Sequence, residues 1–424
     1  MKPMVFTASC TRRADVYSTS NSVRSFDVMR RAGTLLSLAA WIGIGSVAYT
    51  QPPASPASSD TKPTLSGCST AKASVKFDFE GASRSVCYVE GERTLSILVT
   101  PEHLPPINPS PWYAFRYSAA EGGNLTVHVR YLGARHRYAP KWRGRGDPSA
   151  ISVVVANDAS SVSITLPPGE GVISGQPLLT SAHYDNVLSQ LKQSGGGSRI
   201  VMGQSHDSRP VEAVRLGAAD APRLVVLLGR QHPPEVSGAF AMDAFSLKIA
   251  ELVRNGSING KEFQFLVVPL LNPDGVARGH WRGNLGGTDL NRDWGTFKQP
   301  ETRAVHDWLA SLPPHVRPVL MLDFHSTNRN LFYVQGDEAN AQGKAFLAAW
   351  LGGKENAFAG YPFKIEPRDA NPGSGTTKNW FSAKYGIPAY TYEVGDNSDP
   401  AAVRAAAEAL AQNLIPSLVM PLKE

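Results

Sequence analysis

The sequence predicts two folded domains: an α/β domain with a mostly parallel, mixed sheet flanked by helices, and before it a smaller antiparallel β-sandwich domain. In the second half of the chain, apolar runs alternate with helix-like stretches, which is typical of a parallel sheet with crossover helices. In the first half, short runs of alternating polarity recur between turn residues, which is typical of a sandwich. A length of 424 residues, with 42% hydrophobic and 18% charged residues, suits a chain that buries two cores.

The chain begins with a segment that we expect to be removed on export. Met29-Arg30-Arg31 precedes the apolar stretch 32–48, and this order of basic and apolar residues is typical of a secretory signal. Ser46-Val47-Ala48 fits a cleavage site. We therefore expect residues 1–48 to be a leader, translation to start at Met29, and the protein to be periplasmic or secreted. The alternative is a segment that stays attached as a membrane anchor.

The charge of the chain does not favour a nucleic-acid partner. Residues 1–48 contain six Lys or Arg and two Asp or Glu, so this segment carries four of the six net positive charges. A basic cluster remains between residues 135 and 145, and we interpret it as a solvated loop. No stretch after residue 50 is long and apolar enough to span a bilayer, so we expect no stable membrane span once the leader is removed. The oligomeric state does not follow from the sequence.

Residues 49–65 are rich in Pro, Ser and Ala and are predicted to form a disordered linker. The sandwich is expected over residues 66–170. Its predicted strands are 73–79, 94–99, 112–117, 124–131, 151–155 and 162–166. Once Cys10 of the leader is set aside, Cys68 and Cys87 remain as an even pair, and export favours a disulfide between them.

The α/β domain is expected over residues 171–424. Its predicted strands are the apolar runs 224–228, 263–271, 319–324 and 387–392. Its predicted helices lie near 181–192, 235–254, 300–312, 339–351 and 376–385, and Asp399-Pro400 caps a last, alanine-rich helix.

Reactive side chains follow each of these four apolar runs. His232 and Glu235 follow the first, residues 272–275 the second, His325 the third and Glu393 the last. In open α/β sheets, ligands bind beyond the carboxyl ends of the strands, where such residues converge. A catalytic zinc ion takes three nitrogen or oxygen ligands and keeps one position open, and His232, Glu235 and His325 supply that set. The sequence therefore predicts one zinc ion per chain.

Further polar residues are expected around this ion. Glu393 is the candidate general base, because burial opposes its ionisation while a nearby cation favours it. A ligating histidine usually donates its other N–H to an acidic or carbonyl partner, and Asp289 is the candidate. Arg282, Asn291 and Arg292 suit an anionic substrate, since a guanidinium binds a carboxylate through two parallel hydrogen bonds.

Six motifs in chain order carry a resemblance to a known family. They are H-x-x-E at 232–235, N-P-D-G at 272–275, W-R at 281–282, D-x-N-R at 289–292, His-Ser at 325–326 and the glutamate at 393. Over about residues 70–420 the chain resembles the zinc carboxypeptidases of the carboxypeptidase A superfamily. Residues 111–116 and 183–185 are similar to the cytosolic carboxypeptidase branch, whose bacterial members also carry a sandwich domain.

The resemblance implies hydrolysis of a C-terminal peptide or isopeptide bond, with zinc on the three predicted ligands. It implies that Arg282 polarises the scissile carbonyl and that Asn291 and Arg292 hold the substrate's free carboxylate. Glu393 would take the proton of water and pass it to the leaving amine. Asp289 would orient His232.

The chain departs from this family at one point. Carboxypeptidases usually place a substrate-binding tyrosine about twenty residues before the catalytic glutamate, and residues 366–377 contain none. Thr376, Thr377 and Lys378 lie where the family lines its specificity pocket. Lys378 could favour an acidic terminal residue, or it could be an exposed helix lysine.

Two other functions stay open at this point. Zinc-dependent deacylases of the aspartoacylase and succinylglutamate desuccinylase type, which act on small acyl-amino-acid substrates, share H-x-x-E, D-x-N-R and the E-V-G of 393–395. They lack the sandwich and the N-P-D-G segment. The second alternative is an exported protein that binds anionic chain ends without cleaving them.

Overall fold

The computed structural model describes residues 66–83, 85–144, 151–336, 339–368 and 374–419. The leader, its signal peptide, the start at Met29 and the linker 49–65 lie outside the described residues. Within the described part of the chain, no helix has both the length and the apolar composition that crossing a bilayer requires.

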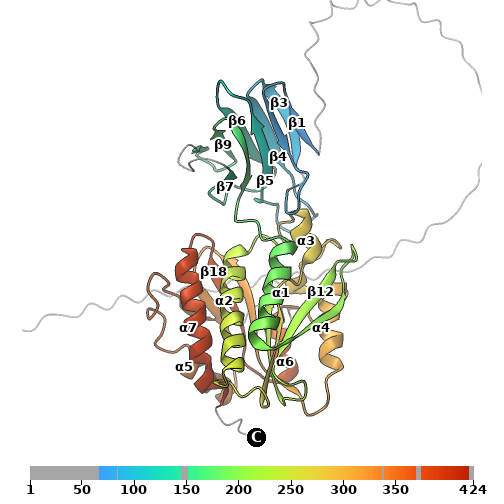
Figure 1. The fold of residues 1–424 in the computed structure, drawn as a ribbon, viewed down its shortest axis with the longest axis vertical. Coiled ribbons are helices and arrows are strands. Elements are labelled where there is room, and N and C mark those ends of the chain that lie inside the picture. Colours follow the sequence, from blue (N-terminus) through green and yellow to red (C-terminus); the bar gives the residue numbers. More distant parts are fainter. Residues whose placement is uncertain (1–65, 84, 145–150, 337–338, 369–373, 420–424) are drawn as a thin grey trace, which may run out of the picture. The chain divides into compact units, whose positions relative to one another are not determined.

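The first described residues form a sandwich of two five-stranded sheets (Figure 1). One sheet has the order β1-β2-β5-β10-β7 and the other β3-β4-β6-β9-β8. The strands are β1 (Gly67–Ser69), β2 (Ala73–Lys76), β3 (Val86–Gly91), β4 (Thr94–Val99), β5 (Ala114–Ala119), β6 (Leu125–Tyr131), β7 (Lys141–Gly144), β8 (Ser152–Val155), β9 (Ser161–Leu166) and β10 (Gly169–Ser174). Buried and less buried residues alternate along β6 and β9, and the buried ones form one core with Phe115 and Tyr117 of the facing sheet.

Three details of the sandwich differ from the prediction. β1, β3, β7 and β10 were not among the six predicted strands. β10 extends the domain to Ser174, slightly beyond the expected end at residue 170. β4 and β6 pair in parallel, whereas a uniformly antiparallel sandwich was expected. The reason is that β5 belongs to the other sheet, so the chain crosses the core twice between β4 and β6 and returns in the same direction.

A disulfide joins the two sheets and confirms the predicted pairing. Cys68 of β1 and Cys87 of β3 are bonded, with their Cα atoms 5.5 Å apart. Cys87 is fully buried in the core of the sandwich.

The second part of the chain is the predicted α/β domain, with a helix-flanked mixed sheet. The sheet order is β11-β12-β14-β13-β15-β18-β16-β17, and the four central strands β14, β13, β15 and β18 run parallel. The strands are β11 (Ser198–Gln204), β12 (Pro210–Leu216), β13 (Arg223–Gly229), β14 (Phe263–Val268), β15 (Arg317–Thr327), β16 (Leu331–Val334), β17 (Lys364–Pro367) and β18 (Ala389–Gly395). The four predicted apolar runs are these central strands, which are buried on both faces and therefore almost uniformly apolar. The flanking strands were not predicted, because they are shorter or carry polar residues.

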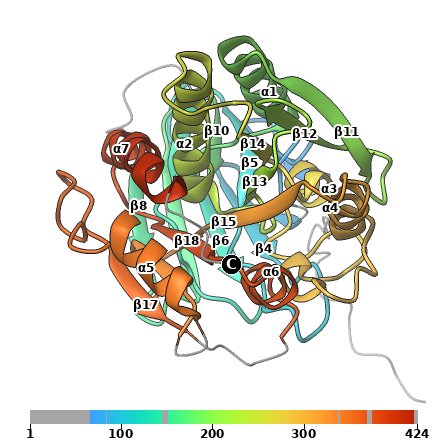
Figure 2. The ribbon, with the colours of Figure 1, turned by 90° about the horizontal axis from the view of Figure 1, so that it is seen from below.

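Helices cover both faces of this sheet. They are α1 (Ser181–Gly195), α2 (Val236–Arg254), α3 (Pro273–Arg278), α4 (Pro300–Ala310), α5 (Ala341–Trp350), α6 (Thr377–Tyr385) and α7 (Pro400–Leu418), with a short 3-10 turn, η2 (Leu290–Arg292). Figure 2 shows α2 and α7 on one side of β15 and α6 on the other. The two sides form separate apolar cores. Phe245 and Leu410 belong to the first, and Val305 and Phe381 to the second.

Removing the disulfide should destabilise the sandwich. In the chain-entropy model, a crosslink at this separation contributes about 3 kcal/mol to the free energy of unfolding, so the double variant Cys68→Ser/Cys87→Ala should lose about that amount. Guanidinium denaturation followed by the fluorescence of the buried Trp112 measures the loss. The wild type under reducing conditions should approach the variant. Equal midpoints for variant and oxidised wild type would contradict the expectation.

Candidate active site

The carboxyl ends of three parallel strands bring the predicted site residues to one edge of the sheet. The last residue pair between β13 and β15 is Gly229 with Phe324, and His325 follows Phe324 directly. β15 and β18 are paired so that His325 and Glu393 lie directly opposite each other. Residues facing each other across adjacent parallel strands point to the same side, so the general-base candidate and one metal ligand are neighbours by register alone.

The turn between β13 and α2 holds the other two ligands, and buried hydrogen bonds fix its shape. Arg230 has a positive φ of 53°, and its buried guanidinium donates to the Tyr184 hydroxyl at 2.6 Å and to the Pro233 carbonyl. Asn272 of the N-P-D-G motif donates to the Gln231 carbonyl at 3.0 Å, while its own side-chain oxygen caps α3. A backbone held from two sides can keep His232 and Glu235 in one orientation.

His232, Glu235 and His325 converge with a spacing that suits one metal ion. Their candidate ligand atoms all lie within 4.8 Å of one another. His232 Nδ1 is 2.8 Å from Oε1 of Glu235, and His325 Nδ1 is 2.7 Å from Oε2 of the same carboxylate. The two Nδ1 atoms are 3.2 Å apart. Two ligands of a tetrahedral zinc ion at about 2.0–2.1 Å lie about 3.3 Å apart, so the two imidazoles already have the separation that zinc requires.

Each of these histidines has a carboxylate on its second ring nitrogen. His232 Nε2 is 2.9 Å from Asp289, the partner predicted from the sequence. His325 Nε2 is 2.8 Å from Asp323, which the sequence analysis missed. Gln231 donates to the same Asp323 oxygen at 2.6 Å. This pattern is typical of zinc sites, where the outer carboxylate fixes the tautomer and orientation of the histidine. An aspartate two residues before a histidine on a buried strand was the signal that could have revealed it.

The balance of charge in this cluster favours a cation. Burial and Arg282 lower the pKa of His232, but Glu235 and Asp289 outweigh them and raise it. Burial also lowers the pKa of His325, but Asp323 and Glu235 raise it well above the usual value. Without a metal, the neighbouring carboxylates therefore favour the protonated form of both imidazoles. Zinc balances the same charges and requires neutral histidines, so its binding should release protons.

Glu393 has the electrostatics of a general base. Burial raises the pKa of its carboxyl to about 7. The charge of His325 opposes this shift, and the charge of Glu235 adds to it. Among the residues that the structure describes, none hydrogen-bonds to its buried Oε2 atom. A carboxylate with a pKa near neutrality, and with an oxygen that has no partner among the described residues, can exchange a proton with a water molecule bound in the cavity.

Arg282, Asn291 and Arg292 line the same cavity as the predicted zinc ligands and Glu393. Arg282 Nε donates to Asp289 at 2.7 Å. Asn291 Oδ1 accepts the backbone N–H of Thr377 at 2.9 Å, and Arg292 Nη1 donates to the Asn291 carbonyl at 2.7 Å. The structure thus brings every predicted catalytic and carboxylate-binding residue to one cavity of about 290 Å³.

Other cations complete the lining of this cavity. Lys378 is buried rather than an exposed helix lysine, and its ammonium donates to the carbonyls of Val334 and Arg368. The Arg368 guanidinium lies 4.7 Å from the ring centre of Tyr333, which also lines the cavity and lies outside the range 366–377 where the sequence lacks a tyrosine. Arg137 reaches the cavity from the sandwich. The interpretation of residues 135–145 as a solvated loop is therefore wrong for Arg137, because a carboxylate of the α/β domain, Asp396, pairs with it at 2.6 Å.

Comparison with known proteins agrees with this geometry. Residues 186–407, just over half of the chain, match the family described as zinc carboxypeptidase. The chain belongs to the zinc carboxypeptidase family. The members of this family are zinc-dependent hydrolases, and the predicted ligands form the group that could hold the zinc ion.

Relatives and solved structures show how far the likeness extends. An uncharacterised protein of Zymomonas mobilis is 30% identical over 121 residues, and human cytosolic carboxypeptidase 2 is 34% identical over 119 residues. These matches cover 28% and 27% of this chain but only 30% and 13% of the relatives' own lengths. Metallo-carboxypeptidases of Burkholderia cenocepacia and Pseudomonas aeruginosa have similar structures, with TM-scores of 0.65 and 0.61 at 16% and 18% identity. They cover 82% and 81% of this chain and 98% and 97% of their own, and show that the fold is shared.

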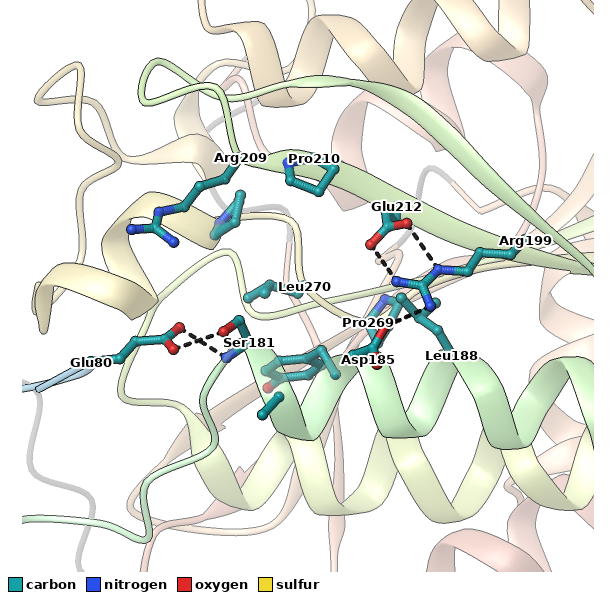
Figure 3. Close-up of a pocket in the computed structure, with 13 residues that line it drawn as sticks. Glu80, Ser181, Asp185, Leu188, Arg199, Arg209, Pro210, Glu212, Pro269 and Leu270 are labelled. Atoms are coloured by element: carbon teal, nitrogen blue, oxygen red, sulfur yellow. Dashed lines mark hydrogen bonds and ion pairs between the residues drawn. The ribbon is translucent and has the colours of Figure 1, made fainter.

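A second hollow of this zinc carboxypeptidase lies between α1 and the hairpin of β11 and β12, and Figure 3 shows its lining. Its charged groups partner one another. Arg199 donates to both Glu212 and Asp185, and Glu80 accepts from the backbone and the hydroxyl of Ser181 at the start of α1 (Figure 3). These interactions hold α1 and its neighbours together, and we assign the hollow a structural role.

Gly238 should be essential for the metal site. A Cβ atom at this position would lie 2.3 Å from the His325 carbonyl oxygen, because the first turn of α2 packs directly on β15. Gly238→Ala should move α2 away and separate His232 and Glu235 from His325. We expect zinc affinity to fall by about 10- to 100-fold, the range typical of outer-sphere changes. Competition with a chelator measures the affinity.

The matched control is Glu251→Ala on the exposed side of α2, where the side chain is 58% exposed. Glu251→Ala should bind zinc like the wild type. Wild-type zinc affinity in Gly238→Ala would contradict the close packing of α2 on His325.

Proposed function

We propose that the protein is a metallocarboxypeptidase that removes the C-terminal residue of a peptide by hydrolysing its last peptide or isopeptide bond. The observation that carries this proposal is the register that places Glu393 opposite His325, inside a cavity lined by Arg282, Asn291 and Arg292. A base, a metal site and groups for a carboxylate then lie around one space. Membership of the family supports the same activity.

In the proposed reaction, zinc and three residues of the chain each have a separate role. Zinc, when bound, supplies Lewis-acid polarisation at the scissile bond. Glu393 accepts the proton of the attacking water and passes it to the leaving amine, for which a pKa near neutrality is suited. Arg282 faces the scissile carbonyl and stabilises the negative charge that develops on its oxygen. Asp289 accepts from Arg282 and from His232, and so links the orientation of both groups.

The cavity favours a substrate with more than one negative charge at its end. Asn291 and Arg292 suit the terminal carboxylate. Arg368 and Lys378 line the same cavity and would favour an acidic side chain on the terminal residue. We propose an acidic chain end as the ligand of this cationic cavity.

We also propose that the enzyme acts outside the cytoplasm, in the periplasm or after secretion. The bonded pair Cys68 and Cys87 supports an oxidising compartment. The sequence also supports export, because in residues 29–48 basic residues precede an apolar stretch, as in a secretory signal.

The deacylase and binding-protein alternatives are less well supported. Asn272 and Asp274 of the N-P-D-G segment, which the deacylases lack, are buried and hydrogen-bonded into the site's framework. A protein that only binds chain ends does not require a carboxylate beside its metal site, whereas Glu393 lies opposite His325 and lines the same cavity.

Glu393→Gln should abolish turnover and leave zinc bound. Loss of a general base costs about 100- to 10,000-fold in rate, and glutamine keeps the size of the side chain. In the wild type, kcat/KM should fall as the pH drops, because the base works only when deprotonated. The midpoint should lie at or below pH 7, since burial raises the pKa of Glu393 to about 7 and a bound cation lowers it. Steady-state kinetics between pH 5 and 9 measure both effects.

The matched control is Glu408→Gln on an exposed position of α7, which should leave the kinetics unchanged. Full activity of Glu393→Gln with zinc bound would remove Glu393 as the base.

A small substrate panel tests the reaction itself. A peptide ending in glutamate should be cleaved about tenfold or more faster, by kcat/KM, than the same peptide ending in glutamine, because the cavity lining is cationic. The amidated peptide should resist cleavage, since Asn291 and Arg292 then lose their partner. Preferential hydrolysis of N-acetylglutamate would show a deacylase instead. Binding of the peptides by the zinc-loaded protein without any turnover would show a binding protein.

A further inference from the structure

The sandwich reaches into the loop that carries Arg282. Glu102, in the loop after β4, accepts hydrogen bonds from the backbone N–H groups of Trp281 and Arg282 at 2.8 Å and 2.9 Å. One carboxylate oxygen receives both bonds. Burial raises the pKa of Glu102, although the two N–H groups of Arg282 and Trp281 oppose the shift. The carboxylate is thus partly removed from water at the point where the two domains meet.

Neighbouring residues interlock the same two loops. The ring of His103 packs edge-on against His280, with 5.0 Å between the ring centres. A Cβ atom on Gly283 would lie 2.5 Å from the His103 ring, so glycine leaves room for this contact. The sandwich loop therefore touches the Arg282 loop on both sides of the Trp281-Arg282 dipeptide.

Arg137 provides a second connection between the sandwich and the site. Its guanidinium lies 5.0 Å from the ring centre of Trp281 and donates twice to Asp396, at 2.6 Å and 2.9 Å. Asp396 follows the end of β18, three residues after Glu393, and its N–H donates to the Thr327 carbonyl at 2.7 Å. The sandwich thus contacts both the backbone and the ring of Trp281. Through Arg137 it also binds Asp396, which follows the end of β18, the strand of Glu393.

The Arg282 loop receives this support at residues 281 and 282. The next carbonyl, that of Gly283, accepts from Asn272 and His280 of the α/β domain, whereas the N–H groups of Trp281 and Arg282 donate to Glu102 of the sandwich. Residues 279–289 contain four glycines and form no helix or strand. Glycine-rich backbone loses much conformational entropy when it is ordered, so external contacts must hold it in one conformation. Within the α/β domain, the bond from Arg282 Nε to Asp289 fixes the side chain, whereas the backbone N–H of Arg282 is bonded to Glu102 of the sandwich.

We propose that Glu102 of the sandwich is a positioning residue for Arg282, so that the sandwich is part of the catalytic apparatus rather than an independent module. This inference rests on the proposed function, in which Arg282 stabilises charge at the scissile carbonyl. A group with that task must be held to within a fraction of an ångström, and a displacement of about 1 Å can cost 100-fold in rate. Glu102 acts on Arg282 through its backbone and does not touch the substrate.

Three variants of the full-length, zinc-loaded chain test the proposal. Glu102→Ala removes the acceptor, Glu102→Gln keeps an acceptor oxygen, and Glu92→Ala removes an exposed glutamate of the same domain that pairs only with Lys72 in the described contacts. Glu102→Ala should lower kcat by about 10- to 100-fold with KM changed less than about threefold. Glu102→Gln should restore kcat to within about threefold of the wild type. Glu92→Ala should match the wild type.

A double-variant comparison separates positioning from general damage. If Glu102 works through Arg282, then Glu102→Ala should have almost no further effect in an Arg282→Ala background. Zinc content and thermal midpoint of Glu102→Ala should stay near those of Glu102→Gln. An equal loss of activity in both backgrounds, or kcat of Glu102→Ala within twofold of Glu92→Ala, would overturn the proposal.

A second readout does not depend on turnover. The backbone amides of Trp281 and Arg282 should exchange with deuterium about tenfold or more faster in Glu102→Ala than in the wild type or Glu92→Ala, because their acceptor is lost. Unchanged exchange of a peptide spanning these residues would overturn the proposal even if the protein hydrolyses no tested substrate. Absence of turnover in the wild type, with the exchange difference present, would reject the proposed function and leave the contact between the domains intact.

Discussion

The site is organised around Glu235, a largely buried carboxylate that contacts two histidines at once. Each histidine has a second carboxylate behind it, Asp289 in one case and Asp323 in the other. Burying so many carboxylates costs several kcal/mol per ion unless positive charge balances them. The carboxylates favour protonated imidazoles, and a divalent cation held by all three residues would balance the same negative charge. The turn after β13, the start of α2 and the end of β15 are all packed to keep these ligands together.

The close packing around the ligands explains the shape of the surrounding chain. Gly238 lets α2 approach β15, and Ser326 accepts the N–H of Gly238 at 2.8 Å, so helix and strand are joined next to His325. Asn291 connects the site to α6 through Thr377. The sheet supplies the last component by register alone, since β18 places Glu393 beside His325. The candidate zinc ligands, Glu393 and the arginines are thus connected through neighbouring elements, as the precise geometry of the proposed reaction requires.

Much of this arrangement could be predicted from the sequence, because it depends on strand ends and short spacings. His232, Glu235, His325 and Glu393 each follow an apolar run, and such runs become adjacent parallel strands. Contacts that depend on packing between distant segments could not be predicted. Glu102 and Arg137 belong to another domain, and no local pattern distinguishes them from surface charges. Arg137 was even misinterpreted as part of a solvated loop.

The missing tyrosine illustrates the same limit. The sequence showed that the usual position before Glu393 is empty of tyrosine, but it could not show that Tyr333 of β16 reaches the cavity. β16 pairs antiparallel with β18, so Tyr333 lies opposite Thr391, two residues before the base. Only the pairing of a short edge strand brings it there. The position of Lys378 likewise depends on segments distant in the sequence, because its ammonium donates to the carbonyls of Val334 and Arg368.

The most direct test of this account is X-ray absorption at the zinc K-edge of the zinc-loaded protein. We predict one zinc ion per chain with nitrogen and oxygen ligands at about 2.0–2.2 Å, including two imidazoles, and loss of one imidazole signal in His325→Ala. A shell with sulfur ligands, a shell without imidazole, or an unchanged spectrum in His325→Ala would contradict the claim that His232, Glu235 and His325 hold the metal.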